Sequence, residues 1–127
     1  MTIAIGTDIV EIKRISDAFK RQGDRLVNRV LTSAEQARLK QLSNEDQQIA
    51  YLAKRWCAKE AIAKALGTGI AKGVGFQQIE ISNLDSGAPT AVLTEGALDQ
   101  LKALGGKSVL ISLSDERQYA VAYCSII

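Results

Sequence analysis

The chain has 127 residues, which is enough for one domain, because domains commonly run to about 100–150 residues. Apolar residues make up 46% and charged residues 24%, so the sequence can bury a core and is not typical of a disordered protein. No apolar run approaches the roughly 20 residues needed to cross a bilayer. The first residues have an acid at Asp8 and no basic segment, unlike a signal peptide. We therefore expect a single cytoplasmic domain over residues 1–127, with no membrane partner.

The sequence contains no histidine. This excludes Ser-His-Asp and Cys-His catalysis, and zinc sites with histidine ligands. The two cysteines, Cys57 and Cys124, are too few for a four-cysteine metal site or a disulfide framework, so we expect them to be core residues. Any chemistry must then fall to carboxylates, lysines, hydroxyls, backbone amides or a metal that prefers oxygen ligands.

The formal net charge of +2 is unevenly distributed, since residues 49–72 alone carry a net +4. Such a cationic segment indicates an anionic ligand or partner, although a solvated helix face explains the same charges equally well. Aromatic residues make up only 5% of the chain, and no RNA-binding motif is present. Platforms for stacking bases are therefore scarce, and we expect no nucleic-acid partner.

Hydrophobic periodicity, capping residues and glycines divide the chain into nine elements. In chain order they are a strand at 2–10, helices at 11–21, about 33–42 and about 45–66, strands at 76–82 and 90–93, a helix at 94–104, and strands at 108–114 and 118–126. Gly23 and Gly67 are expected to end the helices before them, and Thr32 with Glu35 forms a capping box. This order predicts an α+β fold in which helices pack on a mostly antiparallel sheet around one long central helix.

Glu60 lies on the apolar stripe of that long helix, where a carboxylate is costly unless it is paired or bound to a cation. One explanation is an ordinary salt bridge to Lys64, one helical turn later. The other is a metal site shared with Asp8, which lies near the end of the first strand. Asp8 also has a purely structural explanation, as an acid near a helix N-terminus. Two carboxylates without histidine or cysteine ligands suit Mg²⁺.

Cations and glycines surround this predicted metal site. Arg55, Lys59 and Lys64 precede the turn Gly67-Thr68-Gly69, whose backbone could cradle phosphate oxygens. Glycines after a helix are more often a simple C-terminal cap. From the residues alone, the sequence predicts Mg²⁺-assisted chemistry or binding at a polyphosphate.

Three segments carry a resemblance to a known family: residues 6–15 (GTDIVEIKRI), residues 52–70 (LAKRWCAKEAIAKALGTGI) and residues 112–120 (SLSDERQYA). With them, the chain resembles the holo-[acyl-carrier-protein] synthases, the small group of the 4′-phosphopantetheinyl transferase superfamily. The similarity extends from end to end. It implies transfer of 4′-phosphopantetheine from coenzyme A to a serine of apo-acyl carrier protein, for fatty acid biosynthesis, with release of adenosine 3′,5′-bisphosphate.

The resemblance also implies roles for individual residues. Asp8 and Glu60 would hold Mg²⁺ against the coenzyme A pyrophosphate, and Lys64 would stabilise or protonate the leaving phosphate. The remaining residues implied to bind nucleotide and phosphates are Arg55, Lys59, Gly67, Thr68, Gly69, Ser112 and Ser114. Some members have a histidine at the position of Asp115, so that contact is not expected here.

An acidic carrier protein would dock on Arg14 and Arg21 of the first predicted helix, with Arg25 just beyond. A solvated helix face is the alternative explanation for these arginines. The family resemblance further implies a homotrimer with active sites at subunit boundaries. A protein that binds coenzyme A or an acidic partner without transferring anything is the competing functional hypothesis.

Overall fold

A computed structural model describes all residues, 1–127. The elements are β1 (Ala4–Glu11), α1 (Ile12–Gln22), α2 (Asp24–Val30), α3 (Ser33–Lys40), α4 (Glu45–Ala65), a short 3₁₀ helix (Phe76–Gln78), β2 (Ile79–Asn83), β3 (Pro89–Leu93), α5 (Glu95–Ala103), β4 (Val109–Asp115) and β5 (Tyr119–Ile126). The strands form a three-stranded sheet in the order β1-β5-β4 and a two-stranded sheet of β2 and β3, and all pairs are antiparallel. The predicted α+β fold is confirmed. No helix has the length and apolar character needed to cross a membrane.

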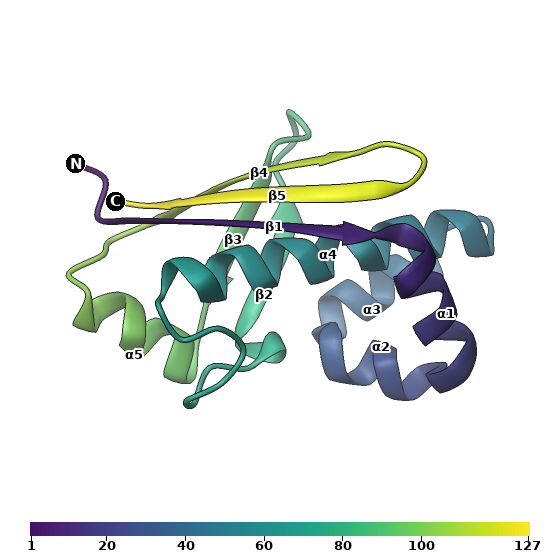
Figure 1. The fold of residues 1–127 in the computed structure, drawn as a ribbon, viewed down its shortest axis with the longest axis horizontal. Coiled ribbons are helices and arrows are strands. Elements are labelled where there is room, and N and C mark those ends of the chain that lie inside the picture. The colour runs from purple at the N-terminus through teal and green to yellow at the C-terminus, as the bar shows by residue number, and fades with distance from the viewer.

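The long helix α4 lies along one face of the three-stranded sheet, beside β1 and β5 (Figure 1). Small residues allow this close packing. A Cβ atom at Gly6 would lie 2.1 Å from the carbonyl oxygen of Ala61, so only glycine lets β1 approach α4 so closely. Opposite, β5 presents Ala120 and Ala122, which are buried. The strand that carries Asp8 is therefore held firmly against the helix that carries Glu60.

Burial extends around more of α4 than the single apolar stripe that the sequence predicts. Twelve of its 21 residues are buried, including Arg55 and Lys59 on a side that the apolar pattern does not mark. The reason is that α4 is covered by the sheet on one side and by α1, α2, α3 and β2 on others. Cys57 and Cys124 are both fully buried, as predicted.

The helix α2 is not predicted from the sequence. Gly23, with φ 53°, ends α1 as expected, but the chain continues directly into seven helical residues instead of a loop. Leu26, Val27 and Val30 make α2 part of the core. The segment is too short to show a clear period, and tertiary packing supports it. The prediction of a strand from Phe76 is also wrong over its first three residues, which form the 3₁₀ helix.

The predicted capping box is confirmed at the start of α3, where Thr32 and Glu35 exchange hydrogen bonds between side chain and backbone.

The sheet face that points away from α4 has no covering element (Figure 1). Alternate residues of the three strands are exposed there, because successive side chains of a strand point to opposite faces. Its large apolar members are Ile5, Ile9, Leu110, Tyr119, Val121 and Tyr123. We call this set the outer sheet face.

Candidate functional site

Asp8 on β1 and Glu60 on α4 lie close enough for the charge of Asp8 to act on Glu60. The side chain of Asp8 is only 15% exposed, and Glu60 is half-buried. None of the salt bridges in the chain includes Glu60. Partial burial, and secondly the neighbouring Asp8 carboxylate, raise the pKa of Glu60 above its ordinary value. The structure thus brings together the two acids that the sequence singles out, and leaves one of them without a partner.

Lys64 takes a different partner from the one that helical spacing suggests. Its ammonium donates to Oδ1 of Asp8 at 2.9 Å and to the carbonyl oxygen of Thr7 at 3.1 Å, with no salt bridge to Glu60. The lysine side chain remains half exposed. A cation therefore lies beside the acid pair at the surface, where it can also reach a bound anion.

Cys57 lies beneath this pair. Its thiol is 3.2 Å from the carbonyl oxygen of Asp8 and 3.4 Å from Oδ2 of the same residue. Burial, and then the charge of Asp8, raise the pKa of the thiol to about 12. The thiol is therefore neutral near pH 7 and is not a nucleophile, which agrees with its predicted role in the core.

The turn Gly67-Thr68-Gly69 begins three residues after Lys64, and two of its amides are used to cap α4. The amides of Thr68 and Gly69 both donate to the carbonyl oxygen of Ala63, at 3.2 and 3.0 Å, and thereby cap α4. The two glycines have φ of 83° and 63°, which is the left-handed conformation that such a cap requires. These two amides are therefore used within the chain, and binding of nucleotide and phosphates by the turn stays a prediction. The turn contributes only small residues that leave space beside Lys64.

Lys59 also differs from its prediction as a phosphate ligand. Its side chain is fully buried, and its ammonium donates to Glu35 Oε1 at 2.6 Å, to the Val30 carbonyl at 2.7 Å and to the Phe76 carbonyl at 3.1 Å. All three N–H donors are used, so none remains for a phosphate. Glu35, which the sequence marks only as a capping residue, also accepts from the Ile81 amide at 2.8 Å. This cluster ties α4 to α2, α3 and β2.

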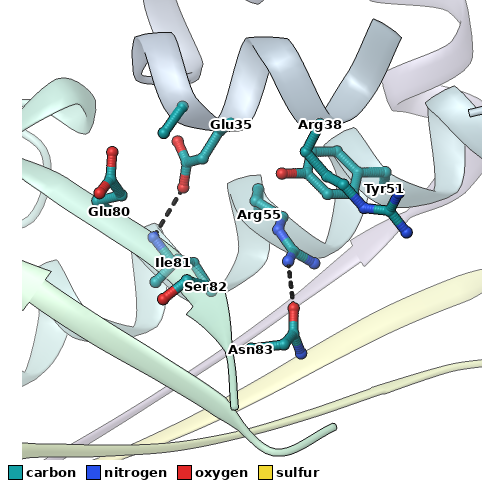
Figure 2. A pocket seen from close by; sticks show the side chains of 9 residues that line it. Glu35, Arg38, Tyr51, Arg55, Glu80, Ile81, Ser82 and Asn83 are labelled. Atoms are coloured by element: carbon teal, nitrogen blue, oxygen red, sulfur yellow. Dashed lines mark hydrogen bonds between the residues drawn. The ribbon is translucent and has the colours of Figure 1, made fainter. Parts of the chain in front are cut away.

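Arg55 borders two adjoining cavities on another side of α4, about 140° around the helix axis from Glu60 at about 100° per residue. The guanidinium lies 4.1 Å from the Tyr51 ring centroid and donates to Oδ1 of Asn83 at 2.8 Å, while its buried Nε has no partner. Figure 2 shows Arg55 and Glu35 pointing toward β2 across the smaller cavity, of about 300 Å³.

The wider cavity, about 610 Å³, is lined by Arg38, Lys54 and Arg55 and by no carboxylate. With three cations and no acid on its wall, it suits a phosphorylated ligand.

Ser112 and Ser114 are not brought to the carboxylates. Both are exposed on β4 and lie on the outer sheet face, where Ser112 is in register with Tyr123 and Ser114 with Val121. Asp8 is on the opposite face, toward α4. Asp115, after these serines, lies 3.8 Å from Lys54. Within one chain, the third motif is therefore separated by the sheet from the first two.

The three arginines predicted to dock an acidic partner, Arg14, Arg21 and Arg25, are exposed on α1 and α2. A fourth, Arg29, was not singled out from the sequence. It lies on α2 with its guanidinium 5.6 Å from the Phe76 ring centroid, and its charge acts on Glu60. Arg25 and Arg29 are one helical turn apart, so a prediction of α2 would have placed Arg29 beside Arg25.

Comparison with known proteins adds the following. Residues 4–124 match the 4′-phosphopantetheinyl transferase superfamily. A holo-[acyl-carrier-protein] synthase of Shewanella frigidimarina is 54% identical over 120 residues, which cover 94% of this chain and 93% of that protein. The one of Shewanella amazonensis is 51% identical over 94% of each.

Solved structures agree in fold. The holo-[acyl-carrier-protein] synthase from Neisseria meningitidis superposes with a TM-score of 0.89 and 38% identity, covering 100% of this chain and 99% of that one. The enzyme from Bacillus anthracis in complex with CoA (3′,5′-ADP) gives a TM-score of 0.83 at 33% identity, with 99% and 96% covered.

Proposed function

The chain belongs to the 4′-phosphopantetheinyl transferase superfamily, as a holo-[acyl-carrier-protein] synthase, and we propose that it transfers 4′-phosphopantetheine from coenzyme A to a serine of apo-acyl carrier protein with the help of Mg²⁺. The observation that carries the proposal is the pair of carboxylates, Asp8 and Glu60, beside the exposed ammonium of Lys64. Transfer of this kind needs positioning and charge neutralisation more than it needs histidine or a covalent nucleophile.

The acid pair fits Mg²⁺. Burial, and then the charge of Asp8, raise the pKa of Glu60, and a divalent cation at this site would favour its ionised form. Two protein ligands suffice, because Mg²⁺ commonly completes its shell with water and substrate phosphates. Asp8 and Glu60 would hold the ion, which when bound would neutralise the pyrophosphate and stabilise charge on its oxygens.

The residues of the chain have separate tasks in the transfer. Lys64 is placed to donate to an oxygen of the leaving phosphate, since half of its side chain is exposed and its ammonium already lies at the acid pair. The carrier serine oxygen bonds to the phosphorus that bears pantetheine, and the bond from that phosphorus to the bridging oxygen breaks. The electron pair leaves with adenosine 3′,5′-bisphosphate, and the serine proton passes to a carboxylate or to water.

We further propose that three copies of the chain assemble and complete one another's sites. The outer sheet face exposes large apolar residues, which monomeric proteins seldom gather in one patch. Ser112 and Ser114 lie on that face, and Arg55 opens into a cationic cavity away from Glu60. A neighbouring copy would supply these residues to the nucleotide, and the space beside Thr68 would receive it. Sedimentation of the protein as a monomer would contradict this arrangement.

Arg14, Arg21 and Arg25 are proposed to dock the acidic carrier protein, because all three are exposed cations on α1 and α2 and the charge of Arg14 acts on Glu60. The product would serve fatty acid biosynthesis in the cytoplasm.

One experiment tests the activity and separates it from simple binding. Apo-acyl carrier protein is incubated with coenzyme A, Mg²⁺ and the protein, and its mass is measured. Transfer adds the phosphopantetheine group, a gain of about 340 Da. The same mixture with the Glu60→Ala variant should leave the carrier unchanged. Tight binding of coenzyme A by the wild-type protein without any mass gain would overturn the proposal and favour a binding protein.

A further inference from the structure

Cys57 is a buried residue beside the acid pair to which the proposed reaction gives no role. It lies on α4, three residues before Glu60, and Lys64 follows Glu60 by four residues. Positions spaced by three and four residues share one side of a helix. All three act on Asp8 of β1: the thiol and the ammonium are within hydrogen-bond reach of its carboxylate, and its charge acts on Glu60. One side of α4 thus surrounds Asp8 with a thiol, a carboxylate and an ammonium.

The two oxygens of the Asp8 carboxylate have different partners. The Lys64 ammonium donates to Oδ1 at 2.9 Å, and the sulfur of Cys57 lies 3.4 Å from Oδ2. Of the hydrogen bonds in the chain, only that of the thiol reaches Oδ2. The lysine side chain is half exposed, whereas Cys57 is fully buried. The carboxylate is therefore held from the solvent side by one group and from the interior by the other.

The thiol has one proton and three acceptors within reach. Besides Oδ2, these are the carbonyl oxygens of Asp8, at 3.2 Å, and of Ala120, at 3.4 Å. Alternate pairs of an antiparallel ladder exchange amide hydrogen bonds, and the Ile12 amide donates to the Gln118 carbonyl. In this register the carbonyls of Asp8 and Ala120 have amide partners of their own. The charged Oδ2 is the stronger acceptor and lacks another donor, so the S–H is directed to it.

A hydrogen bond to Oδ2 from the interior leaves the carboxylate able to bind a cation. Each carboxylate oxygen has two acceptor sites, so Oδ2 can accept the thiol proton and still contribute to a metal site. Because the thiol is neutral, it orients the carboxylate without cancelling its charge. Hydrogen bonds of this kind, made to a ligand by a residue that does not touch the metal, commonly raise metal affinity by fixing the orientation of the ligand.

We propose that Cys57 is a positioning residue that orients Asp8 for the divalent cation, an inference that rests on the proposed function. The chain contains its own matched comparison. Cys124 on β5 is also fully buried, but its thiol forms no hydrogen bond. Loss of either sulfur removes the same volume from the core, and only the loss at Cys57 removes a donor from Asp8.

Metal binding without turnover is the direct test. Mn²⁺ shares the oxygen ligands of Mg²⁺ and is detected by electron paramagnetic resonance, so each protein is titrated with Mn²⁺ in the presence of coenzyme A and without carrier. Cys57→Ala should raise the Kd for Mn²⁺ about 10-fold, the lower end of such effects, because a thiol is a weak donor. Cys57→Ser keeps a donor and should stay within about threefold of wild type. Cys124→Ala should not change the Kd.

The rate of carrier modification at a series of Mg²⁺ concentrations gives a second measurement. Cys57→Ala should need about 10-fold more Mg²⁺ for its half-maximal rate, and should come within about threefold of the wild-type kcat when Mg²⁺ saturates. Thermal unfolding shows what the lost packing costs, which should be similar in Cys57→Ala and Cys124→Ala.

The outcomes separate this inference from the proposed function. A lower melting temperature of Cys57→Ala with an unchanged Kd for Mn²⁺ would overturn the inference, because Cys57 would then act only in packing. Equal weakening of Mn²⁺ binding in Cys57→Ala and Cys57→Ser, or in Cys57→Ala and Cys124→Ala, would also contradict it. In each of these cases wild-type binding and transfer would still support the proposed function. If the wild-type protein does not bind Mn²⁺, the metal assignment fails and this inference fails with it.

Discussion

Lys59 and Glu60 are consecutive residues of α4, but their surroundings differ. Lys59 points into the interior, where Glu35 and two carbonyl oxygens use all its donors. Glu60 lies half-buried at the surface, with another acid beside it and no salt bridge of its own. A polar group that is fully satisfied holds the fold, whereas one left unsatisfied is held ready for a ligand. The comparison predicts that the two residues fail in different ways when they are changed.

The largest expected effect is on catalysis. Glu60→Ala or Asp8→Ala should lower the transfer rate at least ~10³-fold, because each removes a ligand for the metal that neutralises the pyrophosphate. The melting temperature of Glu60→Ala should stay the same or rise slightly, because carboxylate repulsion is relieved. Carrier mass and thermal unfolding are the measurements.

Glu45→Ala, an exposed acid in the first turn of the same helix, is the matched control and should keep full activity. Full activity in Glu60→Ala would remove the metal assignment. Loss of activity together with unfolding would mean that Glu60, like Lys59, stabilises the fold.

Lys59→Met should show the reverse pattern, with a loss of about 3–5 kcal/mol of unfolding free energy, because it leaves the Glu35 carboxylate buried without its cation. Adding Glu35→Gln removes that charge and should restore part of the loss. Urea denaturation measures both. Lys54→Met, on the same helix, breaks only a partly exposed pair of 3.8 Å and should cost less than ~1 kcal/mol. If Lys59→Met is as stable as Lys54→Met, the buried cluster does not support the fold.

The same comparison explains how far the sequence could predict the molecule. Asp8 and Glu60 could be paired in advance because strand alternation and helical spacing each place an acid where apolar residues are expected. The burial of Lys59 could not, since its partners come from segments 17 to 29 residues away and lysine is usually a surface residue. The apolar pattern of α4 predicts which side of the helix packs on the sheet, but the burial of its other sides depends on tertiary packing.

The cap formed by the glycine turn and the helix α2 could not be predicted, for local reasons. The sequence Gly67-Thr68-Gly69 is compatible with a helix cap and with a phosphate-binding turn, and only the structure shows the hydrogen bonds to Ala63 that form the cap. The segment from Asp24 to Val30 is too short for periodicity to identify. With that helix unpredicted, Arg29 had no expected position beside the acid pair.

A smaller effect is expected at the exposed row of arginines. Arg14→Glu with Arg21→Glu should raise the KM for the carrier protein about 10- to 100-fold and leave the affinity for coenzyme A unchanged, because opposite charges steer and hold the carrier there. Lys102→Glu with Lys107→Glu makes the same change of net charge at exposed positions in the last turn of α5 and just after it, and should leave the KM unaltered. An equal rise in both double variants would show a net-charge effect, and no rise in either would place docking elsewhere.

The smallest expected effect is on the pH dependence of stability, to which Glu60 contributes. Its folded-state pKa is raised above the ordinary 4.5, chiefly by burial, so the folded chain holds this proton more tightly than the unfolded chain does. The contribution of Glu60 to stability is therefore full below pH 4.5 and is lost as the pH rises through the folded-state pKa.

Glu60→Gln has no such loss, so its stability relative to wild type should increase across that window and then level off, as urea denaturation at a series of pH values would show. Glu116→Gln, on an exposed turn, provides the baseline. Mg²⁺ should reverse the difference, because the ion binds the ionised pair and stabilises only the wild-type protein. A difference between the two proteins that neither pH nor Mg²⁺ changes would mean that Glu60, like Lys59, is already satisfied by the protein itself.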